Sequence, residues 1–157
     1  MRMPNMMLTT LALIVLIGGL GYLSRDDGRV GAGDIGLQLG VPVEHMLTPE
    51  RRIQALPVIV QLVNRTDAAV KLVADGPCKI FRFVVTTPGG EFVQAMRQGE
   101  TDCTENVTER MLGAGEILEE IRQIPLDTAR YMPGDYAVRV KFWNHQASAS
   151  FELTGQQ

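Results

Sequence analysis

The side chains that most often carry catalysis are scarce in this chain and do not form a recognisable set. Histidine occurs only at His45 and His145, and serine only at Ser24, Ser148 and Ser150. A hydrolase nucleophile lies between glycines in a tight turn, and none of these serines has glycine neighbours. A zinc site needs three or four ligands, and neither histidine has a second ligand at metal-binding spacing. The sequence therefore predicts no catalytic residue, no metal site and no cofactor site.

Carboxylates could supply acid–base chemistry, but here the candidates, Glu119-Glu120 and Glu100–Asp102, are adjacent only along the chain. Neighbouring residues of a strand point to opposite faces, so we expect these side chains to be solvated surface groups. Gly113-Ala114-Gly115 lacks the flanking strand and helix of a dinucleotide-binding loop. The net charge is −3 and the sequence has no basic stripe, so we expect no nucleic-acid partner. These observations together predict a protein that is not an enzyme.

An apolar run near the N-terminus determines the compartment in which the chain works. The run Met6–Leu23 contains no charged residue, and Arg2 precedes it. A transmembrane helix needs about 17–25 apolar residues, so we favour an uncleaved, single-pass anchor over residues 1–24. The alternative is a signal peptide cleaved near Gly19-Leu20-Gly21, after which the domain is secreted. In both cases residues 25–34 form a linker, and the chain beyond them lies outside the cytoplasm.

The two cysteines, Cys78 and Cys103, are expected to form a disulfide. Exported domains usually pair their cysteines, and two cysteines alone are too few ligands for zinc. The loop that they would close contains about 25 residues, for which chain entropy predicts a stabilisation of about 3–4 kcal/mol.

The segment Gln98–Glu105, which contains Cys103, is the best candidate for a partner-binding loop. It is long, polar and acidic, and we assign Glu100, Thr101 and Asp102 as its contact residues. A disulfide would preorganise the loop and so reduce the entropy lost on binding. The alternative is that this segment is only a solvated connection.

The chain from residue 35 to 154 has the pattern of an all-β domain. Apolar residues alternate with polar ones in most segments, and turn residues separate the segments. Ala114–Ile124 fits a helix or a strand, and we favour a strand because Gly113 and Gly115 disfavour a helix start. Trp143 lies near a strand end, either as a buried cap or as an exposed contact residue. About seven to nine short strands predict an immunoglobulin-like antiparallel β-sandwich, preceded by one N-terminal transmembrane or signal helix. The predicted strands outside the ambiguous segment are Ile35–Leu39, Leu56–Val63, Val70–Val73, Lys79–Thr87, Glu91–Met96, Asn106–Met111, Tyr136–Phe142 and Ala149–Leu153, with a turn at Asn144–Ala147.

The order of motifs over residues 56–153 resembles the BsuPI family of bacterial proteinase inhibitors. The matching segments, in chain order, are Asn64-Arg65-Thr66-Asp67, Val70-Lys71-Leu72, Phe81-Arg82-Phe83-Val84-Val85, Gly89-Gly90-Glu91-Phe92-Val93, Leu112-Gly113-Ala114-Gly115-Glu116 and Pro133-Gly134-Asp135-Tyr136-Ala137-Val138. The chain departs from the family at Phe92–Met96, where the family has a tryptophan. The resemblance implies a single immunoglobulin-like domain of a bacterium that binds another protein, with proteinase inhibition as the family's activity.

These inferences give two expected functions for a domain in the periplasm, attached to the inner membrane through its N-terminal helix. The first is a protein-binding module that inhibits a proteinase or binds an envelope complex. The second is a structural or accessory subunit of such a complex, in which Gly18-Gly19 and Gly21 give the helix a smooth packing face.

We predict that Cys78 and Cys103 are bonded in protein recovered from the periplasm. Alkylation without reductant should add no mass to the intact chain, and labelling of both thiols would contradict the pairing. Cys78→Ser should lower the free energy of unfolding by about 2–4 kcal/mol. As a control, the same substitution should have little effect when both proteins are measured under reducing conditions.

Overall fold

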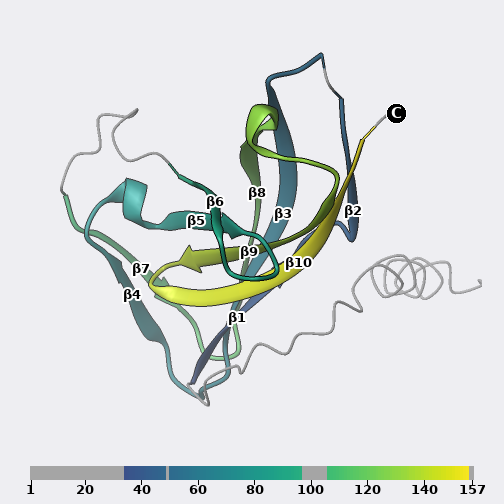
Figure 1. Cartoon of the computed structure of the whole chain (residues 1–157). Helices are drawn as coiled ribbons and strands as arrows, with labels where there is room; N and C mark the ends of the chain where they lie inside the picture. The colour runs from purple at the N-terminus through teal and green to yellow at the C-terminus, as the bar shows by residue number, and fades with distance from the viewer. Residues whose placement is uncertain (1–33, 49, 97–105, 156–157) are drawn as a thin grey trace, which may run out of the picture.

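The computed structural model describes residues 34–48, 50–96 and 106–155, which form ten strands and two short 3-10 turns (Figure 1). A three-stranded sheet has the order β1 (Ile35–Gly40), β3 (Ile53–Asn64) and β8 (Ile117–Asp127). A five-stranded sheet has the order β2 (Glu44–Leu47), β10 (His145–Gly155), β9 (Gly134–Phe142), β5 (Phe81–Thr86) and β6 (Phe92–Ala95). The strands β4 (Val70–Ala74) and β7 (Thr108–Leu112) form a two-stranded ribbon. The turns are η1 (Pro77–Lys79) and η2 (Thr128–Arg130).

All strand pairs are antiparallel except β2 with β10, which are parallel. In Figure 1, β9 and β10 run across the direction of β3 and β8, and the β4–β7 ribbon extends to one side. The all-β prediction is therefore confirmed.

One hydrophobic core joins the three sheets. Alternate residues of β3 point inward, and Leu56, Val60 and Leu62 have no exposed surface. From the five-stranded sheet, Val138 and Val140 of β9 are equally buried and belong to the same cluster. Burial of one such side chain contributes about 1.5–3 kcal/mol, so this shared core is the main source of stability.

A buried asparagine connects the end of β3 to the turn between β7 and β8. Asn64 has no exposed surface, and its amide nitrogen donates to the carbonyls of Ala68 (2.8 Å), Leu112 (3.1 Å) and Gly113 (2.8 Å). Its amide oxygen accepts from both the backbone N–H and the hydroxyl of Thr66. The turn expected at Asn64–Asp67 is thus stabilised by contacts with a distant part of the chain.

Two prolines lie within strands without interrupting the β3–β8 ladder. The carbonyl of Pro125 accepts a hydrogen bond from Gln94 in β6, so it points away from β3. The N–H and C=O of a strand residue leave on the same side, so the ring nitrogen of Pro125 also faces the outer edge of β8. Pro57 is two residues from Ala55, the partner of Pro125, so its nitrogen likewise points away from β8. It points toward the side of β1, but the β1–β3 pairing has already ended at Gly40–Ile59, so no hydrogen bond is lost there.

The strand predictions hold with local corrections. The ambiguous segment Ala114–Ile124 forms a strand, as favoured, because β8 begins within it at Ile117 and continues to Asp127. β3 begins at Ile53, ahead of the predicted start. The turn expected at Asn144–Ala147 is wrong. Trp143 and Asn144, both with positive φ (46° and 66°), form a tight two-residue turn instead, and β10 begins at His145.

The predicted N-terminal helix lies outside the described residues. Within residues 34–48, 50–96 and 106–155, no helix is long and apolar enough to cross a membrane.

Asn64→Ala should lower the free energy of unfolding by about 2–4 kcal/mol, because it leaves buried carbonyls without a donor. Chemical denaturation measures this change. Asn106→Ala, the same substitution at an exposed position, is the matched control and should change stability by less than about 0.5 kcal/mol. Equal effects of the two substitutions would contradict the role given to Asn64.

Candidate functional site

The predicted disulfide is only partly within the described chain. Cys78 lies in η1, between β4 and β5, whereas Cys103 lies outside the described residues. The β4–β7 ladder places Ala74 opposite Thr108. Cys78 follows Ala74 by four positions and Cys103 precedes Thr108 by five, and segments of this length extend about 13–18 Å. The ladder is therefore compatible with the pairing, which stays a prediction.

The loop residues Glu100, Thr101 and Asp102 also lie outside the described residues. Their assignment as partner contacts is therefore still a prediction.

The two histidines lie in the same sheet but far apart. His45 in β2 is opposite Leu153, and His145 is the first residue of β10, so about 27 Å of strand separates them. Burial lowers the pKa of both imidazoles below the usual 6.5, which leaves both neutral at pH 7. Among the described residues, no group of three His, Cys, Asp or Glu side chains could hold a metal ion.

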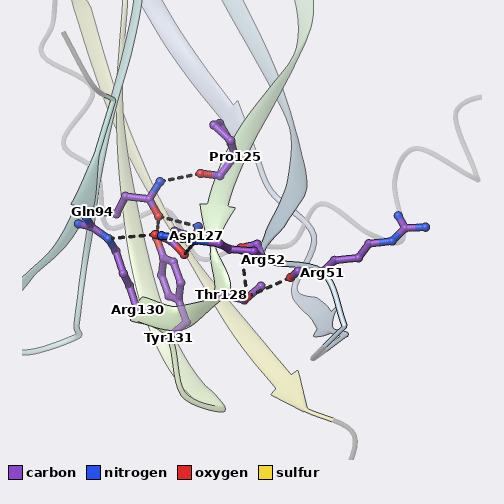
Figure 2. A network of polar contacts seen from close by, with 8 residues as sticks. All are labelled: Arg51, Arg52, Gln94, Pro125, Asp127, Thr128, Arg130 and Tyr131. Carbon is purple, nitrogen blue, oxygen red and sulfur yellow. Dashed lines mark hydrogen bonds and ion pairs between the residues drawn. The ribbon is translucent and has the colours of Figure 1, made fainter. Parts of the chain in front are cut away.

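A network of polar contacts joins β6 to the outer edge of β8 (Figure 2). Gln94 of β6 is at its centre. Its amide nitrogen donates to the carbonyl of Pro125 (2.6 Å), and its amide oxygen accepts from the N–H of Asp127 (3.1 Å) and the hydroxyl of Tyr131 (2.9 Å). One side-chain amide thus takes the place of a neighbouring strand at the edge of β8 and joins the two larger sheets.

The same network attaches η2 to the segment before β3. Asp127, whose side chain is 13% exposed, lies between the guanidinium groups of Arg52 (3.7 Å) and Arg130 (3.5 Å). The N–H of Thr128 donates to the carbonyl of Arg52 (2.8 Å), and its hydroxyl donates to the carbonyls of Arg51 and Arg52. Figure 2 shows Asp127 of β8 and Thr128 of η2 lying beside Arg52, which precedes β3.

The protonation states in this network favour structural support over acid–base chemistry. Burial, together with the nearby Tyr136 and Asp127, raises the pKa of Tyr131 well above its usual 10. Its hydroxyl therefore stays neutral and donates to Gln94. The carboxylate of Asp127 forms ion pairs with Arg52 and Arg130. The arrangement can stabilise the joint between the sheets.

The adjacent carboxylates Glu119 and Glu120 point to opposite faces of β8, as predicted. Glu119 is exposed and accepts a hydrogen bond from Gln61. Glu120 is half-buried and forms an ion pair with Arg122, whose guanidinium lies 5.7 Å from the centre of the Phe81 ring. The expectation that both are solvated surface groups is thus wrong for Glu120.

Trp143 is a buried cap and not an exposed contact residue. It is 5% exposed, and its backbone N–H donates to the carbonyl of Ile80 (2.9 Å). Its indole belongs to the core cluster at the end of β9.

The sequence analysis predicted neither this network nor the exposed isoleucines on the outer face of β3 and β8. Gln94 contacts residues more than 30 positions away, which no local pattern reveals. The outward-facing apolar residues of β3 could have been found from the sequence, because Ile53–Val63 has apolar residues at both odd and even positions, so that both faces of the strand carry them. A strand with one solvated face would alternate.

Comparison with known proteins does not assign a family. No protein-family profile and no curated protein matches the chain. Among solved structures, the chain is similar to part of the β-glucosidase EmGH1 from Erythrobacter marinus, with a TM-score of 0.41 and 13% identity. The similarity covers 76% of this chain and 15% of the glucosidase. At this distance it carries no argument about fold or activity.

Gln94→Ala should lower the free energy of unfolding by about 1–3 kcal/mol, because it leaves the edge of β8 unpaired. Amide exchange at Asp127 should accelerate more than exchange at the centre of β8. Gln146→Ala, at an exposed position of β10, is the matched control and should change neither quantity. Unchanged exchange at Asp127 in Gln94→Ala would contradict this role.

Proposed function

We propose that this chain is a non-enzymatic protein-binding module with an immunoglobulin-like β-sandwich, held at the periplasmic face of a bacterial inner membrane. The order of its strands supports this fold. β3 and β8 are neighbours in one sheet, and β10, β9 and β5 are consecutive in the other. Strands B and E of an immunoglobulin domain share one sheet in this way, and G, F and C share the second.

The observation that carries the proposal is a tyrosine at the start of β9. The Tyr136 hydroxyl accepts from the N–H of Met132 (3.0 Å) and donates to its carbonyl (2.9 Å). Immunoglobulin-like domains have such a tyrosine corner at the start of strand F, the place that β9 would occupy. The sequence signal is Pro133-Gly134-Asp135-Tyr136, in which Gly134 has a φ of 147°.

The fold and the compartment together favour binding as the activity. Immunoglobulin-like domains recognise partners through sheet edges and end loops. The loop with Glu100, Thr101 and Asp102 remains our candidate contact, and the resemblance to the BsuPI family points to a proteinase as its target. The second candidate function is an accessory subunit of an envelope complex, which would bind through its membrane helix.

The test is a pull-down from solubilised membranes with the full chain, combined with a panel of proteinases. Replacing Glu100, Thr101 and Asp102 by a Gly/Ser stretch should reduce partner recovery at least about tenfold, since a contact loop typically contributes more than 1.4 kcal/mol. Replacing Ser148 and Ser150 by alanine is the control and should leave recovery unchanged.

Dose-dependent inhibition of one proteinase supports the inhibitor. A stable membrane complex without inhibition supports the accessory subunit. Unchanged recovery with the Gly/Ser loop, while circular dichroism shows an intact fold, removes the loop from the binding surface.

A further inference from the structure

The outer face of the β1–β3–β8 sheet exposes a group of apolar side chains to solvent, beside a polar row formed by Gln38, Gln61 and Glu119. We call the apolar group the isoleucine face and define it by Ile53, Pro57, Ile59, Ile117, Ile121 and Pro125. Ile121 is 67% exposed, Ile117 56% and Ile53 55%. Ile59 lies directly opposite Ile121 in the ladder, so the apolar side chains of the two strands are neighbours. Neighbouring exposed apolar side chains such as these mark an interaction site more often than isolated exposed residues do.

The outer face of the five-stranded sheet is different. There the outward positions of β5 and β9 carry Arg82, Arg139 and Lys141, and those of β10 carry Ser148 and Ser150. The isoleucine face is therefore a specific feature of one side of the domain.

Two carboxylates, those of Glu119 and Asp127, lie on the same side of β8 as the isoleucine face. Glu119 accepts a hydrogen bond from Gln61, and Asp127 is held by arginines. Arginines also lie at both ends of the face. The guanidinium of Arg65 covers Gly36, where a Cβ would be 3.1 Å from it, and Arg52, with a side chain 79% exposed, precedes Ile53. An apolar surface flanked by cations is typical of segments that bind anionic membrane surfaces.

The connection to the N-terminal run brings this face close to a bilayer. The run ends at Leu23, and Ile35 begins β1, an edge strand of the same sheet. The linker between them spans about 36–40 Å when fully extended and about 17–20 Å on average when flexible. A tether of this length keeps the sheet within about one domain diameter of the membrane and raises its effective concentration there.

We propose that the isoleucine face lies on the surface of the bilayer that holds the N-terminal run. The inference rests on the anchored form proposed above. In this orientation the isoleucines enter the boundary between headgroups and acyl chains, and the arginines meet lipid phosphates. The polar face of the five-stranded sheet then points away from the membrane.

The test uses the full chain reconstituted into vesicles of phosphatidylethanolamine and phosphatidylglycerol with brominated acyl chains. Ile121→Trp places a fluorophore on the isoleucine face, and Ser150→Trp is the matched variant on the opposite outer face. The buried Trp143 gives both variants the same background. Bromine should quench the added fluorescence of Ile121→Trp at least about twofold more strongly than that of Ser150→Trp.

Each other outcome overturns the inference in a distinguishable way. If neither variant is quenched although the chain stays with the vesicles after a carbonate wash, the anchor stands and the docked face is wrong. If the chain is washed off, the anchor fails and the inference fails with it. If Ile121→Trp is shielded from both bromine and aqueous acrylamide, a protein or a second copy covers the face instead of lipid.

A second pair of variants controls for the possibility that the added tryptophan itself draws the face into the bilayer. Ile117→Glu with Ile53→Trp should lose the quenching that Ile53→Trp alone shows, because a carboxylate on the face opposes its entry into the bilayer. Quenching that is unchanged by Ile117→Glu would contradict the proposal.

Discussion

The structure depends on one constraint, which is that the two larger sheets bury their inner faces against each other. Leu56 and Val60 of β3 and Val138 and Val140 of β9 belong to one cluster, and none of them has exposed surface. A three-stranded sheet alone could not shield such residues from water on its inner side. The strands of each sheet are therefore stable only while the other sheet is in place.

Polar side chains complete the structure where the core ends. Asn64 occupies the bend after β3, Gln94 joins β6 to the edge of β8, and Tyr136 stabilises the entry to β9. Each gives a backbone group a side-chain partner where no neighbouring strand supplies one, and a net hydrogen bond of this kind contributes about 0.5–1.5 kcal/mol. These three contacts explain how irregular connections coexist with a continuous core.

The sequence predicted what local patterns determine. The alternation Tyr136, Val138 and Val140 correctly gave β9, and Gly113 and Gly115 correctly favoured a strand over a helix in the segment where β8 begins. The parallel pairing of β2 with β10 and the contacts of Gln94 depend on segments far apart in the chain, so no local signal reveals them. The assigned contact residues Glu100, Thr101 and Asp102 rest on composition alone, because they lie outside the described residues.

The central claim is that both larger sheets share one cooperative core, on which the orientation of every proposed surface depends. Native-state hydrogen exchange on the full chain tests it most directly. The account predicts that the amides of Val58 and Val60 in β3 and of Val138 and Val140 in β9 exchange through one opening event, with the same free energy as global unfolding. Loss of protection in β3 and β8 under conditions that leave β9 and β10 protected would contradict it.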